Sequence, residues 1–291
     1  MAESCYKFND VSSAINTIDG YVGVENGGNV EYVKAPISNY CRFVNTSGYD
    51  ICFNYSQMVS SGVIHFLKTL ENKFDSKYDK LAEYAILWLC YKLNQNPNTS
   101  RTNLNHFYTN YIEKKKYYNN KINGDDSPSY KAIIDQKKDL MNINIKEILK
   151  FYEALKTLCK IYNECNKGEL DCNKCSEDAN KFADQFKELN KDSKNIDNIS
   201  YSQMLSTLLN DYDNFKIHFA EKCSHCSDLP TLPRIKTPPS KLIPVLSVFP
   251  VIPVFLGIAY KYSLFGIDKI FQRQYLRKKL KKVKKKLKLN I

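Results

Sequence analysis

Apolar residues recur every three or four positions over several long stretches of the chain. Between residues 76 and 94 the pattern consists of Leu81, Ala85, Trp88 and Tyr91, which predicts a helix with one buried face. Two further stripes have the same spacing: Ile148, Tyr152, Leu155, Cys159 and Tyr162, then Leu205, Leu208, Tyr212, Phe215 and Phe219. Shorter helices are expected near 57–72, 104–118, 129–141 and 176–189. Strand patterns are scarce, so the fold class is predicted to be mostly α.

The stretch from Leu242 to Tyr260 has a different character, because its 19 residues carry no formal charge. As a helix it would be about 28 Å long, close to the thickness of a bilayer's hydrocarbon core. A buried core helix is the alternative, but core helices usually carry a polar stripe and this stretch has a single polar side chain, Ser247, before its aromatic end. We predict one C-terminal transmembrane helix at 242–260, kinked by its prolines.

Charge indicates how this span is oriented. Of the 43 Lys and Arg residues, 13 follow Ser240, where Asp268 is the single acid, so residues 1–240 carry no net charge. Basic residues beside a span resist translocation, which predicts a cytoplasmic C-terminal tail and an outward N-terminal domain. The alternative, a tail-anchored protein with its large domain in the cytosol, would require moving this charge across the bilayer. The N-terminus has no basic and apolar signal-peptide pattern, so the span itself is expected to direct insertion.

These patterns divide the chain into four parts. We expect an α-helical, cysteine-containing outward domain at 1–227, a proline-rich stalk at 228–241, the span at 242–260 and a basic cytoplasmic tail at 261–291. Prolines at the density found in the stalk favour a semi-extended chain. Turn residues predict loops at 20–28, 94–101, 123–129 and 190–200.

The tail combines apolar residues at spacings of three and four with many bases, which predicts a basic amphipathic helix on an anionic lipid surface. Its candidate membrane-surface residues are Arg273, Arg277, Lys278, Lys279, Lys281, Lys282, Lys284, Lys285, Lys286 and Lys288. A nucleic-acid partner is not expected, because the span lies a few residues upstream. Two roles stay open for these bases: fixing topology alone, or binding a cytoplasmic partner.

All ten cysteines precede the span, and an even number on one side of a membrane favours an oxidising exterior. Nine are disulfide candidates: Cys5, Cys41, Cys52, Cys159, Cys165, Cys172, Cys175, Cys223 and Cys226. The remaining Cys90 lies inside an apolar helix and is interpreted as a buried free thiol. Zinc held by the pairs 172/175 and 223/226 is the alternative, although 47 residues separate the pairs, more than a zinc ribbon usually has.

No arrangement of residues predicts a reaction or a bound cofactor. The four histidines fit no triad or metalloprotease pattern, and Gly27-Gly28 lacks the setting of a phosphate-binding loop. Four Asn-x-Ser/Thr triplets begin at Asn45, Asn54, Asn98 and Asn198, but such matches arise by chance in an Asn-rich chain. An enzyme is therefore not expected.

Several long strings carry a resemblance to a known protein family. They are Cys5-Tyr6 with Ile15-Asn16 and Ile18-Asp19; Lys77-Tyr78-Asp79-Lys80-Leu81-Ala82-Glu83-Tyr84-Ala85-Ile86-Leu87-Trp88-Leu89; Tyr91-Lys92-Leu93-Asn94-Gln95; Phe151-Tyr152-Glu153-Ala154-Leu155; Leu170-Asp171-Cys172 with Cys175; and Gly257-Ile258-Ala259-Tyr260-Lys261-Tyr262-Ser263-Leu264-Phe265-Gly266. Over nearly its full length the chain resembles the PIR (Plasmodium interspersed repeat) family, variant antigens of malaria parasites, especially the rodent-parasite members.

This resemblance implies a surface or exported antigen of the infected red cell, in the parasite or infected red-cell membrane system, with no catalytic activity. It implies immune evasion and binding to a host cell-surface receptor or antibody. It also implies that Cys90 stands outside the disulfide set, since similar sequences commonly have Ser there. A structural or trafficking role, in which the tail recruits membrane or skeleton components, is the alternative.

Overall fold

The computed structural model describes residues 8–28, 30–41, 51–74, 77–165, 172–192, 198–222 and 229–236, together with Lys279. The chain divides into two units, Met1–Pro238 and Pro239–Ile291. All helices and strands discussed below belong to the first unit, which we call the helical domain. The predicted span at 242–260 lies outside the described residues. Within the described ranges, no helix is both long enough and apolar enough to cross a membrane.

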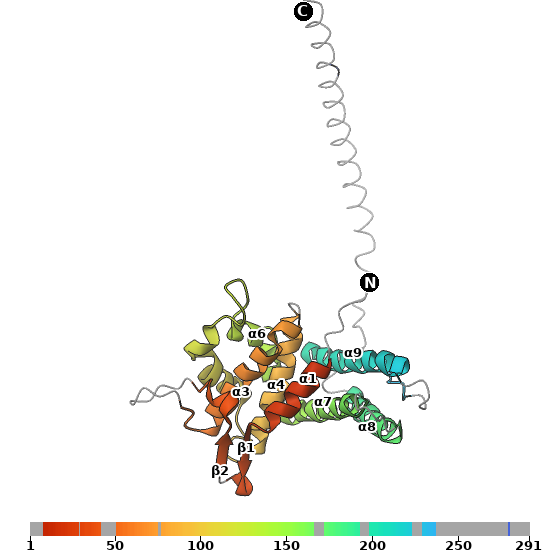
Figure 1. Cartoon of the computed structure of the whole chain (residues 1–291), viewed down its shortest axis with the longest axis horizontal. Helices are drawn as coiled ribbons and strands as arrows, with labels where there is room; N and C mark the ends of the chain where they lie inside the picture. Colours follow the sequence, from red (N-terminus) through yellow and green to blue (C-terminus); the bar gives the residue numbers. More distant parts are fainter. Residues whose placement is uncertain are drawn as a thin grey trace, which may run out of the picture. The chain divides into compact units, whose positions relative to one another are not determined.

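Six long helices form the body of the helical domain (Figure 1). They are α1 (Phe8–Asp19), α3 (Tyr55–Leu70), α4 (Tyr78–Gln95), α7 (Ile145–Cys165), α8 (Cys172–Lys191) and α9 (Ile199–Lys222). The short helices are α2 (Ala35–Ser38), α5 (Leu104–Tyr108) and α6 (Tyr130–Asp135), with single turns η1 (Asn26–Gly28), η2 (Glu71–Lys73), η3 (Thr109–Glu113), η4 (Lys116–Asn119) and η5 (Lys138–Asn142). The mostly α fold class is confirmed.

One antiparallel hairpin accompanies the described helices. It consists of β1 (Val22–Glu25) and β2 (Val30–Val33), paired from Val22 with Val33 to Glu25 with Val30. The two strands extend from the edge of the helical body (Figure 1). The sequence predicted a loop at 20–28, so this hairpin is a correction. The reason is that four-residue strands give a weak signal, whereas the turn between them is marked by Asn26 and Gly27, both with positive φ.

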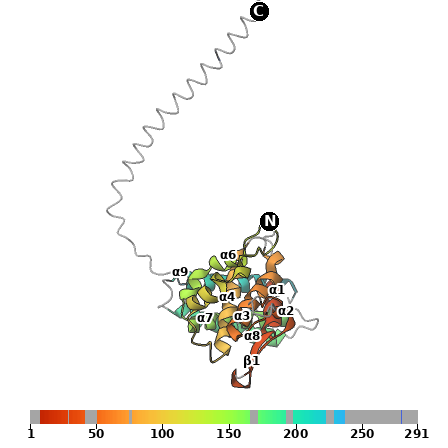
Figure 2. The same ribbon diagram turned by 90° about the vertical axis from the view of Figure 1, so that its left-hand side faces the viewer.

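Helix α4 occupies the centre of the domain in both views (Figures 1 and 2), between α3, α6 and α7. The side chain of Trp88, a residue of α4, is fully buried. Gly62 of α3 faces the indole so closely that a Cβ at this position would lie 2.3 Å from Cη2 of Trp88. Glycine at position 62 therefore allows α3 and α4 to pack around the largest side chain of the core.

Asp19, the last residue of α1, links three helices through its carboxylate. Oδ1 accepts hydrogen bonds from the indole N–H of Trp88 in α4 and the hydroxyl of Tyr152 in α7, each at 3.0 Å. Oδ2 lies 3.0 Å from Nζ of Lys156. The buried Nζ of Lys92 lies 3.7 Å from Oδ1 and donates to the backbone oxygen of Asp19 at 2.8 Å. Burial lowers the pKa of Lys92, and the charge of Asp19 opposes this shift.

A buried acid, Glu83 of α4, faces α9 and the segment after α6. Its Oε2 lies 3.3 Å from Nζ of Lys137. Burial raises the pKa of Glu83 and the charge of Asp211 adds to this, while Lys137 and Thr207 of α9 oppose it. The pKa of Glu83 is raised overall, so the folded domain holds a proton on Glu83 more firmly than the unfolded chain does.

This shift predicts a pH dependence of stability. As pH rises from the ordinary value of 4.5 through the raised folded-state pKa of Glu83, the free energy of unfolding is expected to lose a contribution that is fully present at lower pH. Glu83→Gln should remove this part of the pH slope, whereas the exposed control Asp139→Asn should retain it. Urea unfolding at a series of pH values from 4 to 8 measures both slopes. If the free energy of unfolding changed with pH in the same way for wild type and Glu83→Gln, Glu83 would not be the source of this part of the slope.

Candidate interaction surface

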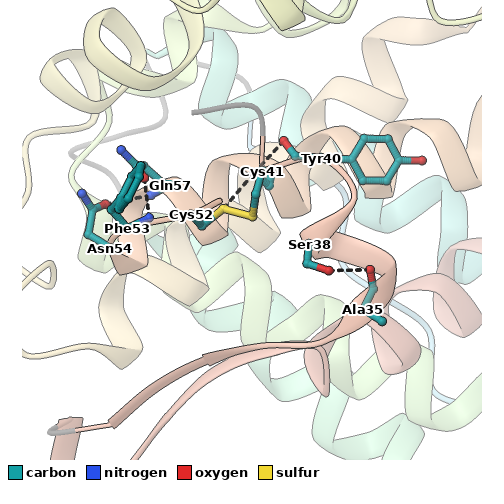
Figure 3. The surroundings of a disulfide bond; sticks show 9 residues. Ala35, Ser38, Tyr40, Cys41, Cys52, Phe53, Asn54 and Gln57 are labelled. Atoms are coloured by element: carbon teal, nitrogen blue, oxygen red, sulfur yellow. Dashed lines mark hydrogen bonds between the residues drawn. A yellow bond between two sulfur atoms is a disulfide. The ribbon is translucent and has the colours of Figure 1, made fainter. Parts of the chain in front are cut away.

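The disulfide between Cys41 and Cys52 closes a loop beside the N-terminus of α3 (Figure 3). The two Cα atoms are 4.9 Å apart, and both cysteines are buried. Ser61 of α3 fixes this position: its Oγ donates to the backbone oxygen of Tyr40 at 3.1 Å and lies 3.4 Å from Sγ of Cys52. The two ends of the loop are therefore held against α3, while the enclosed residues 42–50 lie outside the described ranges.

Two apolar side chains flank the buried Cys52 and point away from the core. Ile51 is 44% exposed and Phe53 is 57% exposed. The backbone here is fixed, because the N–H of Phe53 donates to Oε1 of Gln57 at 2.6 Å and Oδ1 of Asn54 accepts from the N–H of Gln57 at 3.0 Å (Figure 3). Exposed apolar side chains on a fixed backbone are suited to contact with another protein, since little conformational entropy is lost on binding. We take Ile51 and Phe53 as the candidate site.

Removing this crosslink is expected to weaken the fold. Cys41→Ser/Cys52→Ser should lower the free energy of unfolding by about 2–3 kcal/mol, because the disulfide constrains a short loop in the unfolded chain. Cys90→Ala serves as control, since it removes a buried sulfur that belongs to no crosslink, and about 1 kcal/mol is expected for it. Urea unfolding under non-reducing conditions measures both. A double variant as stable as wild type would show that the crosslink carries no stability.

The other described cysteines follow the sequence expectations with one correction. Cys165 and Cys175 form a disulfide that joins the end of α7 to the first turn of α8. Cys172 is also disulfide-bonded. The zinc alternative is therefore wrong for the 172/175 pair, whose thiols are oxidised; within the described ranges no cluster of His, Cys, Asp and Glu suited to a metal ion occurs. Cys5, Cys223 and Cys226 lie outside the described residues.

Cys159 is the correction, because it was a disulfide candidate and is a free thiol. It lies in the middle of α7 with its side chain in the core, 1% exposed. Burial raises the pKa of the Cys159 thiol to about 12, so it is not a reactive thiolate at neutral pH. Its place in the apolar stripe of the predicted helix was the signal for burial. Cys90 is likewise free and buried, as predicted.

The predicted stalk, 228–241, is described only at residues 229–236, which lie against α8 and α9. The hydroxyl of Tyr212 donates to the backbone oxygen of Pro230 at 2.8 Å. The side-chain amide of Asn190 donates to the backbone oxygen of Arg234 at 2.8 Å and accepts from the N–H of Lys236 at 3.0 Å. In this stretch the chain is part of the domain surface and not a free spacer. The candidate tail residues lie outside the described ranges except Lys279, which is exposed.

Comparison with known proteins identifies the family. The model of the Plasmodium variant antigen proteins Cir/Yir/Bir matches residues 5–261. The chain belongs to this family. The match covers the helical domain and the predicted span and stops where the predicted tail begins. Among curated proteins no match is found.

A solved structure supports membership of the Cir/Yir/Bir family. The chain is similar to a structure described as that of a Plasmodium PIR protein ectodomain, with 34% sequence identity and a TM-score of 0.59. The match covers 80% of this chain and 100% of the solved one. The PIR resemblance inferred from the sequence strings is thus confirmed. Exposure of Ile51 and Phe53 had no sequence signal, because both residues are of types that are usually buried.

Proposed function

We propose that this family member is a single-pass membrane antigen of the infected cell that displays its helical domain outward for contact with host factors and for immune evasion. Family membership supports the antigen role, and the related structure is described as an ectodomain. The observation that carries the host-contact proposal is the pair Ile51 and Phe53, apolar and exposed on a backbone fixed by the Cys41–Cys52 disulfide and the start of α3.

The proposed anchor and orientation rest on charge and length. The 19 uncharged residues at 242–260 separate a charge-neutral body from a tail with 12 bases and one acid at 261–291. A helix of this length is sufficient to span the hydrocarbon core, and the bases favour the cytoplasmic side. The tail is proposed to lie on anionic lipid, where each base contributes about 1 kcal/mol.

Binding of the purified helical domain, residues 1–238, to host leukocytes and red cells tests the contact proposal. Ile51→Ser/Phe53→Ser is expected to reduce cell binding at least tenfold while leaving the circular dichroism spectrum and thermal unfolding unchanged. Ile217→Ser is the matched control, because Ile217 is also apolar and 63% exposed but belongs to α9 and not to the segment that contains Cys52, and its loss should leave binding unchanged. Equal binding by all variants would remove this surface from the proposal.

The alternative is a trafficking or structural role carried by the tail, which the concentration of bases at 261–291 favours. The alternative predicts no cell binding by the helical domain. It also predicts that replacing the ten tail bases with Gln mislocalises the full-length chain. Binding by the domain together with unchanged localisation of this tail variant would exclude the alternative.

A further inference from the structure

A surface groove of about 670 Å³ lies where α7 and α8 pack side by side and α9 begins (Figure 1). We call it the α7–α8 groove, and it is bordered by Lys150 and Glu153 of α7, Lys181, Gln185 and Leu189 of α8, and Tyr201 of α9. Leu189 and Tyr201 are buried, and the hydroxyl of Tyr201 donates to the backbone oxygen of Leu189 at 2.9 Å. The Tyr201 ring therefore offers apolar surface to the groove, whose volume suits a lipid headgroup with its first methylene groups.

Gln185 brings to the groove a polar atom that lacks a donor. Its Oε1 is buried and accepts no hydrogen bond from any described residue. Nearly every buried acceptor in a folded protein has a donor, so this atom indicates a donor that the described part of the chain does not supply. A ligand with an N–H group in the groove would supply it.

Charged side chains of both signs line the rim of the groove, four acids and two lysines. Glu153 and Lys181 form no ion pair with a described residue, so both charges can pair with a ligand. Two of the other acids, Asp184 and Glu188, form exposed pairs with lysines of the same helix, and such pairs are weak and exchange readily. The rim therefore favours a zwitterion, with its anionic group beside Lys181 and its cationic group beside the acids.

The chain that leads to the proposed span passes beside this groove. Asn190, the neighbour of Leu189 in α8, donates to the backbone oxygen of Arg234 and accepts from the N–H of Lys236. Residues 237–241 alone separate Lys236 from Leu242, where the proposed span begins, and a chain of this length reaches at most about 22 Å. This end of the groove is therefore restricted to the neighbourhood of the bilayer, where phospholipid headgroups are the concentrated zwitterions.

We propose that the α7–α8 groove binds a phosphoethanolamine headgroup of a phospholipid in the membrane that anchors the protein. The phosphodiester pairs with Nζ of Lys181, the primary ammonium pairs with Glu153 and donates to Oε1 of Gln185, and the glycerol end contacts Leu189 and Tyr201. A choline headgroup fits less well, because its quaternary nitrogen has no N–H group for Gln185. The inference rests on the proposed anchor at 242–260, which brings lipid to the groove, and it gives the helical domain a second attachment to the bilayer.

Calorimetric titration of the full-length protein in a non-ionic detergent tests this inference. Dihexanoyl phosphatidylethanolamine is expected to bind at least fivefold more tightly than dihexanoyl phosphatidylcholine. Glu153→Gln, Lys181→Gln and Gln185→Leu should each weaken binding of the ethanolamine lipid at least fivefold. Lys146→Gln is the matched control, because this exposed lysine of α7 does not line the groove, and it should leave binding unchanged. Unchanged thermal unfolding curves check that all variants fold.

Several results would overturn the headgroup site. One is equal binding of the two lipids, and another is equal binding of the ethanolamine lipid by wild type, Glu153→Gln and Lys181→Gln. If inorganic phosphate or glycerophosphoethanolamine bound as tightly as the lipid, the occupant would not be a lipid. If wild type bound no lipid and Lys181→Gln lost binding to host cells, the occupant would be a protein.

The titration in detergent does not depend on membrane orientation, so it can fail separately from the proposed function. Absent lipid binding, together with an N-terminus accessible to external protease on intact cells, overturns the headgroup site and leaves the outward display intact. Lipid binding together with an inaccessible N-terminus supports the headgroup site and overturns the outward display.

Discussion

Asp19→Ala is expected to lower the free energy of unfolding of the helical domain by about 3–5 kcal/mol, the usual cost of leaving a buried charge without its partner. The variant removes the acceptor for Trp88 and Tyr152 and the carboxylate beside Lys92, whose side chain is 2% exposed. Urea unfolding followed by circular dichroism measures the loss.

Asp10→Ala is the matched control for this prediction. Asp10 lies on the same helix, but its carboxylate is 29% exposed and its partner, Nζ of Lys73, is 3.5 Å away and more exposed. A surface pair of this kind contributes about 1 kcal/mol or less. If both variants lost the same small amount, the linkage of α1, α4 and α7 through Asp19 would not stabilise the fold.

Trp88→Ala is expected to cost about 3–5 kcal/mol, since it leaves a cavity between α3 and α4 that the backbone cannot fill. Gly62 increases the effect, because it has no side chain that could move into the space. Phe53→Ala is the control: it also removes an aromatic ring, but one that is 57% exposed, so a change within about 0.5 kcal/mol is expected. Circular dichroism is the probe, since Trp88 is the only tryptophan of the chain. Equal losses for the two variants would contradict the packing described.

The long helices were predictable because each buries one continuous face. The stripe around Trp88 corresponds to α4, and the two later stripes correspond to α7 and α9. The predictions at 57–72 and 176–189 correspond to α3 and α8 in the same way. In these elements local periodicity and tertiary burial agree, which is the condition under which a pattern determines structure.

The predicted helices at 104–118 and 129–141 are each broken in the structure. The first becomes α5, the π-helical turn η3 and the turn η4, and the second becomes α6 followed by η5. The apolar spacing is present in both. In the first, the π-helical turn lies where Ser60 of α3 donates to the backbone oxygen of Tyr111 at 2.7 Å. Such long-range bonds leave no periodic signal in the sequence.

Helix α1 and the role of Asp19 were not predicted either. The stripe of α1 is short, and the partners of Asp19 lie 69 to 137 residues away along the chain. For the candidate site, the sequence indicated which cysteines were available but not their connectivity. It also gave no reason to separate Ile51 and Phe53 from core residues, because exposure is set by the fold and not by residue type.

Protease accessibility on intact infected red cells tests the central claim most directly, using full-length protein with one epitope tag at the N-terminus and another at the C-terminus. The account predicts that external protease destroys the N-terminal tag while the tag behind the basic tail survives until the membrane is permeabilised. Survival of the N-terminal tag on intact cells, with digestion only after permeabilisation, would contradict the outward display of the helical domain.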